Sequence, residues 1–580
     1  GRSMTGDSVE YRPSSEVASR FPEIGEAGFK ARVWLIEPDG RASGGARAVF
    51  RLYATAGEKR WLGWLYENLP AFADVAEWAY GIVARHRDAA AVATRWLWGA
   101  VDRRPRYRRM RAIFIRGLGA VYLAAFWSLA VQVDGLIGSR GILPAGEFLS
   151  QLGPLLGGGR YWELPTLLWL DSSDRALHFL CWGGVVVGGL LVAGVLPRAC
   201  LALLWLFYLS LAVVGQDFLG YQWDALLLEA GLLGVLFAPR GPWLGRARRE
   251  PSPGALWLIR WLVFRLMFLS GVVKLTGGDP TWWAWEAMKY HYETQPLPTW
   301  TSWYMHQLPP WFHAASVGYV FWAELITPFF VFGPRRLRMA GFWSLVLLQV
   351  LIAATGNYGF FNALAVVLCL SLVEDRDWAS VLGDPDRDEP APPRPGWWRR
   401  VSLGVAGAII VLVTTMEGLD RSGGTVVFPA PLEAVRSRLA PLRSMNAYGL
   451  FAVMTTERPE IIVEGSEDGE TWSPYEFRWK PGDVNRRPRF TTPHLPRLDW
   501  QMWFAALAPD CGSQPWFLAF ERRLLEGSPE VLGLLRSNPF PARPPRFLRA
   551  RLYLYRFTSP GEKAWWRREA AGLYCPRIAL

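Results

Sequence analysis

Two charged residues stand near the middle of long apolar runs, and this feature limits the fold more than any other. Arg265 lies within residues 255–276, and Glu324 lies within residues 314–332. A charged side chain at the centre of a bilayer costs about 2.5–3.5 kcal/mol and is directed towards a protein interior or a wet cavity. We therefore expect a polytopic α-helical membrane protein that surrounds buried charges. Arg265 and Glu324 could pair with each other.

The apolar runs predict about nine membrane spans. A straight span needs about 20 residues, with a range near 17–25, so one or two of the shorter runs are expected to be tilted, re-entrant or paired half-helices. Basic residues gather in alternate loops, and the positive-inside rule then places the N-terminus in the cytoplasm and the C-terminus outside. The nine runs are residues 114–133, 177–196, 199–214, 223–238, 255–276, 314–332, 340–355, 362–373 and 401–416.

The composition favours a membrane partner over nucleic acid. The formal net charge of +12 could suggest nucleic-acid binding. However, the basic residues cluster beside apolar runs, as in residues 103–111, and this is typical of anchoring at lipid headgroups. The chain also holds 33 Trp, 31 Phe and 19 Tyr, which suits bilayer interfaces. We therefore expect the lipid bilayer as a partner and no nucleic acid.

The chain divides by composition into three expected domains. Residues 1–110 are mixed and polar and predict a soluble cytoplasmic domain, residues 111–416 a transmembrane domain, and residues 417–580 an extracytoplasmic α+β domain. Alternating and helical patterns predict the elements of the two soluble domains. In the first domain these are a strand at 30–37, a turn at 38–40 and a helix beginning within 44–52. In the last they are strands at 451–456, 460–464, 475–479 and 547–557, with helices at 500–507, 516–525 and 530–535.

Familiar catalytic motifs are missing from the sequence. It contains no P-loop, HExxH, CxxC, G-x-S-x-G or GxGxxG, so no cofactor is expected, although an enzyme is not excluded. His291, His306 and His313 lack tight metal-ligand spacing, and no metal site is predicted. Cys511 and Cys575 could form a disulfide if their domain is extracytoplasmic.

The membrane charges are the main candidates for chemistry. The favoured hypothesis is that they form structural ion pairs, and the alternative is a polar cavity that binds or transforms a ligand. In the alternative, a desolvated Lys274 could act as a base, with His291 and Glu293 beside it. The full set of candidate pair or cavity residues is Arg265, Glu324, Lys274, Asp224, Glu229 and Asp217.

The outer loop 277–313 is rich in aromatic residues. Rings at this place are typical of a bilayer interface, which is the favoured interpretation. The alternative is a docking surface for a client protein, because aromatic residues dominate binding hot spots. The candidate client contacts are Trp282, Trp283, Trp300 and Trp303.

Several long stretches make the chain resemble the lipase maturation factor family over roughly residues 112–580. They are residues 132–144, 215–218, 264–275, 291–298, 355–362 and 448–455. The resemblance implies a multi-pass membrane protein that, in animals, lies in the endoplasmic reticulum and assists folding and assembly of secreted dimeric lipases. It also implies a lumenal C-terminal part that binds clients. The membrane part is distantly similar to the vitamin K-dependent carboxylase transmembrane domain, which keeps an enzymatic ancestry open.

Residues 11–87 resemble the back half of a DCC-type thiol-disulfide oxidoreductase domain, which implies a partial thioredoxin-like α/β fold. The matching stretches are residues 37–40, 43–46 and 83–87. The CxxC of that family belongs upstream, so either the gene start is truncated or the redox pair has been lost. The fused architecture and the absence of glycosylation sequons suggest a bacterial inner-membrane protein whose outer side faces the periplasm.

Two functions from different classes follow. The first is a non-enzymatic maturation factor that holds secreted lipase-like clients through the outer loop and the C-terminal domain. The alternative is a membrane enzyme, related to the carboxylase transmembrane domain, that acts on a lipid or a translocated peptide. A transporter is less favoured because the two halves show no internal repeat.

Overall fold

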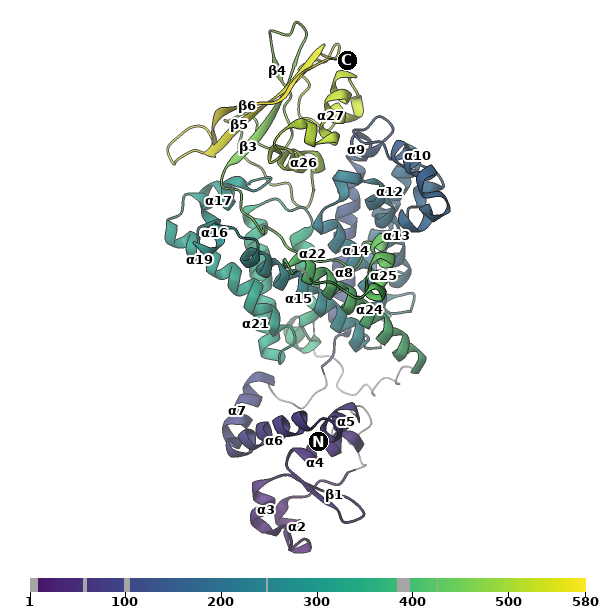
Figure 1. Ribbon diagram of the computed structural model, residues 1–580, viewed down its shortest axis with the longest axis vertical. Helices are drawn as coiled ribbons and strands as arrows, with labels where there is room; N and C mark the ends of the chain where they lie inside the picture. The colour runs from purple at the N-terminus through teal and green to yellow at the C-terminus, as the bar shows by residue number, and fades with distance from the viewer. Residues whose placement is uncertain are drawn as a thin grey trace. The chain divides into compact units, whose positions relative to one another are not determined.

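The computed structural model describes residues 9–55, 60–98, 105–246, 249–382, 397–424 and 426–579. The chain forms two compact units, Gly1–Arg103 and Arg104–Leu580. Figure 1 shows the helices and strands of each unit. The expected boundary at residues 416–417 falls inside a helix of the second unit, α24 (Trp397–Arg421).

The first unit contains a small antiparallel hairpin among helices. Its strands pair Trp34 with Gly44, and Gly40 takes a φ of +83° in the turn between them, a conformation that favours glycine. The predicted turn at residues 38–40 is thus confirmed, whereas the predicted strand at 30–37 is shorter because α3 continues to Ala31. The thioredoxin-like fold remains a prediction. The elements are α2 (Ser14–Val17), α3 (Gly25–Ala31), β1 (Trp34–Ile36), β2 (Ala42–Gly44), α4 (Ala46–Thr55), α5 (Arg60–Asn68), α6 (Pro70–Arg85) and α7 (Arg87–Trp98).

Six helices of the second unit, within the described residues, are long and apolar enough to cross a membrane. They correspond to six of the nine predicted runs. Each of them has residues buried against neighbouring elements and also exposes apolar residues, as membrane helices do. The six are α8 (Arg108–Ala130), α12 (Asp174–Ala193), α13 (Pro197–Val214), α15 (Pro253–Thr276), α21 (Arg335–Thr355) and α24.

The other three predicted runs form shorter helices. The run 223–238 becomes α14 (Gln222–Phe237), and the run 362–373 becomes α22 (Phe361–Cys369) with a 3-10 turn after it. The run 314–332 is divided into α19 (Pro310–Phe321), a π-helical segment at Trp322–Ile326 and α20 (Thr327–Phe330). The count of nine crossings therefore remains a prediction.

Further short helices connect these spans. The segment between α8 and α12 contains α9 (Val133–Ile137), α10 (Ala145–Leu156) and α11 (Arg160–Glu163). The predicted outer loop 277–313 is mainly helical, with α16 (Pro280–Trp283), α17 (Ala287–Thr294) and α18 (Trp300–His306). A 3-10 turn at Gln216–Leu219 joins α13 to α14, and α23 (Ala379–Leu382) follows α22.

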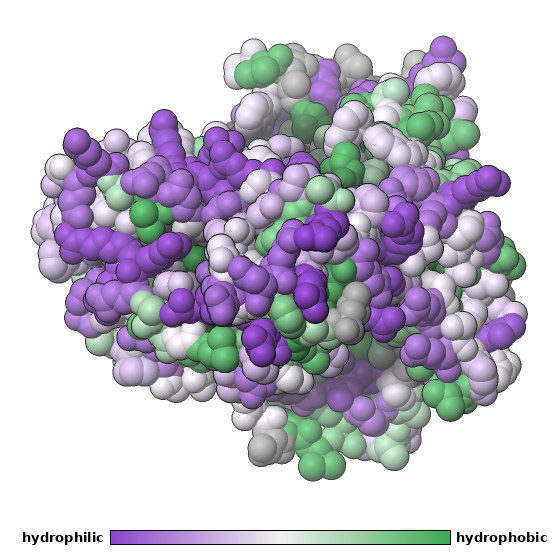
Figure 2. All heavy atoms as spheres, turned by 90° about the horizontal axis from the view of Figure 1, so that it is seen from above, coloured by the Kyte–Doolittle hydropathy of each residue, from purple (hydrophilic) through white to green (hydrophobic). Residues whose placement is uncertain are grey.

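The C-terminal part is built on a four-stranded antiparallel sheet in the order β4-β3-β5-β6. In its centre Glu460 lies opposite Tyr553, and several helices lie beside it (Figure 1). Hydrophilic residues dominate the face of the molecule on this side, with hydrophobic ones scattered among them (Figure 2). The elements are α25 (Ala430–Leu439), β3 (Arg458–Ser466), β4 (Ser473–Pro474), α26 (Arg497–Ala506), α27 (Pro515–Leu525), α28 (Pro529–Leu532), β5 (Phe547–Phe557) and β6 (Trp566–Ile578).

The predicted elements of this part are confirmed where their pattern was strong. The helices at 500–507 and 516–525 and the strands at 460–464 and 547–557 are present. The predicted strand at 451–456 is wrong, because that segment is irregular, and the predicted strand at 475–479 keeps only an isolated bridge from Glu476 to Ser537. Strand β6 was not predicted, since its charged and small residues do not alternate.

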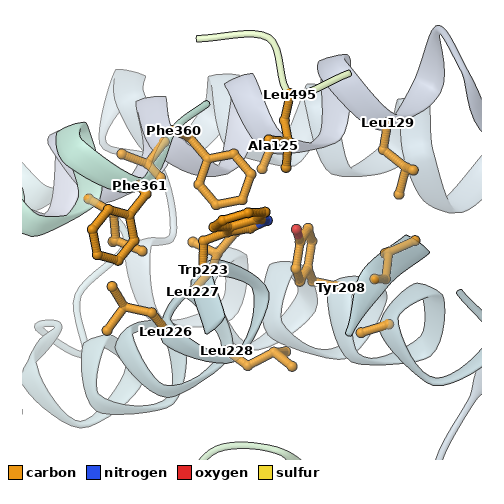
Figure 3. Packing of buried hydrophobic residues seen from close by; sticks show 14 of the residues in the cluster. Ala125, Leu129, Tyr208, Trp223, Leu226, Leu227, Leu228, Phe360, Phe361 and Leu495 are labelled. Atoms are coloured by element: carbon orange, nitrogen blue, oxygen red, sulfur yellow. The ribbon is translucent and has the colours of Figure 1, made fainter. Parts of the chain in front are cut away.

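One hydrophobic core runs through the membrane helices and the C-terminal part. Figure 3 shows Leu495, from the chain before α26, beside Ala125 of α8 and close to Phe360 and Trp223. All four side chains are buried. The C-terminal part is therefore packed against the helical bundle.

Cys511 and Cys575 form a disulfide that links the turn before α27 to the end of β6. The closed loop spans a sequence separation of 64 residues. A cross-link over a loop of that size typically stabilises a domain by about 2–4 kcal/mol.

A buried carboxyl group beside this disulfide should make stability depend on pH. Glu521 of α27 is fully buried, its Oε2 lies 3.3 Å from Cys575 Sγ, and its Oε1 has no hydrogen-bond partner among the residues that the structure describes. Burial raises the pKa of Glu521 from 4.5 to about 8. Between those values the folded state holds a proton that the unfolded state releases, so stability is full below pH 4.5 and falls as the pH rises to 8.

We expect Glu521→Gln to remove this loss, which amounts to about 1.4 kcal/mol per pH unit. The thermal unfolding midpoint of the detergent-solubilised protein, measured at pH 5 and pH 8, checks this expectation. Glu526→Gln, at the end of the same helix, is the control. An unchanged pH slope in Glu521→Gln would show that Glu521 does not cause the effect.

Candidate functional site

Arg265 of α15 is paired with Glu229 of α14 in the interior. The Arg265 guanidinium contacts the Glu229 carboxylate, and both side chains are buried. The Glu229 Oε2 also accepts a hydrogen bond from Tyr448 at 2.7 Å, and Arg265 Nη1 donates to the Asn446 carbonyl at 2.6 Å. This cluster thus joins two membrane helices to the chain that follows α25.

Lys274, in the last turn of α15, is paired with Glu324. Its Nζ lies 2.7 Å from Glu324 Oε2 and donates to the carbonyls of Ser270 at 3.1 Å and Leu450 at 2.9 Å. An ammonium group has three donors, and all three are used. Glu324 lies in the π-helical segment between α19 and α20, a distortion that is frequent at functional sites.

Asp224 of α14 is paired with Arg497 at the start of α26. The guanidinium binds both carboxylate oxygens, at 2.7 and 3.0 Å, and also donates to the Phe218 carbonyl at 2.6 Å and the Tyr208 hydroxyl at 3.2 Å. Two parallel bonds between Arg and a carboxylate are the strong, geometrically specific form of this pair. The membrane helices and the C-terminal part therefore share one buried ion pair here.

The expected pairing of Arg265 with Glu324 is wrong. Arg265 pairs with Glu229 of α14, and Lys274, about two and a half turns further along α15, pairs with Glu324. The pairing of Arg265 with Glu324 was predicted because both lie near the middle of their apolar runs. The actual partners depend on which face of α15 packs against α14 and which packs against the π-helical segment. Each of the three buried pairs either binds a group from the C-terminal part or, in the pair Asp224–Arg497, includes one.

Residues 444–454 make most of these connections, and we call them the docking segment. Their backbone is irregular because its polar groups bind side chains of the membrane part instead of a neighbouring strand. The Leu450 carbonyl accepts from Lys274, the Phe451 carbonyl accepts from Trp282 at 3.1 Å, and the Met454 amide donates to Asp279 at 2.6 Å. This bonding explains why the predicted strand at 451–456 does not form.

An apolar pocket lies beneath the docking segment. It encloses about 700 Å³, including its open mouth. Residues from α15, α17, α21, α22 and the docking segment form its walls, and the lining is mainly apolar. Its polar groups are Ser270, Lys274, His291, Glu324, Gln349 and Tyr358. Such a lining suits a ligand that is largely hydrocarbon with a few polar atoms.

His291 and Lys274 share this pocket. His291 Nε2 lies 3.4 Å from the Tyr358 hydroxyl, and its ring packs edge-on against Phe451. Burial, reinforced by Lys274, lowers the pKa of His291 to about 4, so its ring is neutral at physiological pH. The arrangement can bind a ligand, but an ammonium group with three acceptors holds no free electron pair for proton abstraction.

Two other candidates lie away from the pocket. Glu293 accepts a hydrogen bond from the Phe557 amide at 2.6 Å and so holds the end of β5. The structure does not bring it to Lys274. Asp217 is exposed and takes part in no ion pair among the described residues, so it is not part of a buried charge cluster.

The aromatic outer segment is covered in part by the C-terminal part. Trp282 is buried over Lys274, with Nζ 5.3 Å from the ring centre. Trp300 stacks with Arg487, and Trp303 donates to Thr558 at 3.1 Å. Of the four predicted client contacts, only Trp283 is well exposed, at 62%. Trp282 is therefore buried rather than a surface contact, and client binding by Trp283, Trp300 and Trp303 remains a prediction.

Several buried charged residues could not be predicted from the sequence because they lie outside the apolar runs. Arg497 is one, and Arg458 of β3 is another: it donates to the carbonyls of Gln295 and Pro296 after α17 and pairs with Glu460. An arginine in a polar sequence is normally exposed, so no local pattern marks these residues. Only the acidic partner of Arg497, inside α14, gave a signal.

Comparisons with known proteins match two separate parts of the chain. Residues 109–380 match the lipase maturation factor transmembrane domain, and residues 444–576 match the lipase maturation factor C-terminal domain. The chain belongs to the lipase maturation factor family. It is an integral membrane protein, and the docking segment begins where the match to the family's C-terminal domain begins.

Relatives in this family match the chain along most of its length. Lipase maturation factor 2 of Homo sapiens is 38% identical over 82% of this chain and 83% of its own length. Lipase maturation factor 2 of Gallus gallus is 37% identical over 82% of both chains. Lipase maturation factor 1 of Bos taurus is 33% identical over 81% of this chain and 89% of its own length. No solved structure matches the chain.

Proposed function

We propose that the protein is a membrane maturation factor that holds incompletely folded secreted lipases through its C-terminal sheet. Family membership supports the general role. The observation that carries the proposal is the edge strand β6, which is 13 residues long and pairs with β5 on one side only. A client that exposes unpaired strands can add to such an edge.

The two edges of the sheet differ in a way that favours β6. At the other edge β4 has only two residues, too few to bind a strand. In β6, residues 567–573 are all exposed. Short edge strands block unwanted pairing, and a long exposed one is a template for it. Edge pairing also recognises backbone, which suits a factor whose clients are not yet folded.

A second contact area lies at α16 and α19, which neighbour each other in Figure 1. Trp283, Trp285 and Trp311 are exposed there by 62%, 50% and 70%. We propose that these rings lie at the outer bilayer interface and that a client held on β6 rests against them. The buried Trp282 and the half-buried Trp300 and Trp303 lie behind this area.

The disulfide supports an oxidising environment for the C-terminal part. We propose that this part faces the periplasm of a bacterium and that the N-terminus lies in the cytoplasm, as the distribution of arginines predicts. Secreted clients would then meet the protein as they leave the membrane. A disulfide at that position suits a compartment in which clients acquire their own disulfides.

A membrane enzyme is the second candidate, and the apolar pocket at Lys274 and His291 is the observation that favours it. The difficulty of this candidate is that all three donors of the Lys274 ammonium group are already in hydrogen bonds. The group would have to break its bond to Leu450 or Glu324 before it could act as a base. The maturation role requires no such rearrangement. Replacing Lys274 and Glu324 together by methionine separates the two roles.

Site-specific cross-linking tests the proposed client surface. A photoreactive amino acid at Ala571 of β6 or at Trp283 should cross-link a co-expressed secreted lipase, and the same group at Arg522, exposed on α27, should not. Leu573→Glu, which adds a charge to the edge, should lower both cross-linking and secreted lipase activity. If all three positions cross-link equally, or if the lipase matures normally with Leu573→Glu, β6 is not the client site.

A further inference from the structure

A second cavity lies where three membrane helices begin and a fourth ends. It encloses about 990 Å³, including open space at its mouth. Helices α8, α13 and α15 begin beside it at Arg108, Pro197 and Pro253, and α14 ends at Phe237. Five guanidinium groups and one carboxylate line the cavity, namely Arg111, Arg198, Arg240, Arg246, Arg249 and Glu250.

The cavity carries a strong positive charge. Its one carboxylate, Glu250, is already bound to the Tyr107 amide at 2.9 Å. Arg240, Arg246 and Arg249 are exposed and form no ion pair within the described part of the chain. The N-termini of α8, α13 and α15 add partial positive charge to the same region. An anionic group is therefore the ligand that this lining would attract.

Apolar residues form the rest of the wall. Leu236 and Phe237 line it from α14, and Trp243 lies at its edge with 48% of its surface exposed. Since α8, α13 and α15 are candidate spans, their first turns mark the level of the lipid headgroups, where tryptophan is enriched. A ligand at this place meets guanidinium groups at one end and hydrocarbon at the other.

We propose that this cavity binds the phosphate headgroup of an anionic phospholipid. The planar donor fork of arginine matches phosphate oxygens, and basic pockets between membrane helices are the usual sites for such headgroups. The acyl chains of the lipid lie along Leu236, Phe237 and Trp243. A soluble phosphate compound lacks the apolar part and would leave this wall unused.

Native mass spectrometry of the full-length protein in a neutral detergent tests the proposal. The probes are dihexanoyl phosphatidylglycerol, dihexanoyl phosphatidylcholine and glycerol 3-phosphate. We expect the phosphatidylglycerol to bind most tightly, and Arg240→Gln and Arg246→Gln each to weaken it about fivefold. Both arginines are exposed, so the variants should keep the thermal unfolding midpoint of the parent protein.

Arg336→Gln is the matched control. Arg336 is exposed in the first turn of α21, near Arg338, which contacts Tyr107 just before α8, so it lies at the same end of the bundle but outside the cavity. Its replacement should leave binding unchanged. Equal affinity for the two lipids, equal affinity for glycerol 3-phosphate, or an equal loss in Arg336→Gln would each overturn the proposal.

Discussion

Replacing Asp224 by alanine should destabilise the second unit by about 3–5 kcal/mol, because the change leaves the Arg497 guanidinium buried without its counter-charge. Both side chains are buried, and Arg497 of α26 binds Asp224 of α14. Thermal unfolding in detergent measures the loss. Limited proteolysis should show that the C-terminal part becomes accessible first, since it loses a buried charged link to the helices.

Two further variants make this prediction specific. Asp224→Leu combined with Arg497→Met removes both charges and should recover most of the lost stability. Arg522→Ala breaks a largely exposed pair with Glu526 on α27 and should cost less than about 1 kcal/mol. If Asp224→Ala were as stable as Arg522→Ala, the Asp224–Arg497 pair would not hold the two parts together.

The second large effect is expected for Lys274→Met. The substitution leaves the Glu324 carboxylate buried without its partner and removes the bond to the Leu450 carbonyl, and breaking a buried pair typically costs about 3–5 kcal/mol. We expect less folded protein in the membrane and, with it, less maturation of a co-expressed lipase. The amount of protein extracted and its unfolding midpoint give the first readout, and secreted lipase activity gives the second.

The combined variant Lys274→Met with Glu324→Met distinguishes a structural role from a catalytic one. With no buried charge left, most of the stability should return, and lipase maturation should return with it if the pair only supports the fold. A protein that is folded and stable but inactive would instead show that Lys274 takes part in chemistry. Glu293→Gln serves as a control, because Glu293 binds β5 and does not line the pocket.

The membrane class could be predicted from the sequence because hydropathy and charge are local properties. Arg265 and Glu324 in apolar runs were sufficient to predict buried charges. The partners could not be predicted, because Arg265 meets Glu229 only through the packing of α14 on α15. The ends of helices could not be predicted either where a π-helical segment or a short helix replaces a regular span.

The C-terminal part shows the same limit. The strand at Phe547–Phe557 alternates and was predicted, whereas β6 is an exposed edge strand with no alternation. The composition of residues 451–456 predicts a strand. In the structure, however, the backbone of the docking segment binds the side chains of Trp282, Lys274 and Asp279. Local propensity is overridden wherever distant side chains satisfy the backbone.

Hydrogen exchange of the docking segment tests most directly whether the buried membrane charges hold the C-terminal part in place. The comparison is between the unmodified protein and Lys274→Met with Glu324→Met, in the same detergent. We predict faster exchange in residues 444–454, with unchanged protection along α15 and α19. Unchanged exchange in that segment, together with loosened α15 and α19, would contradict the account.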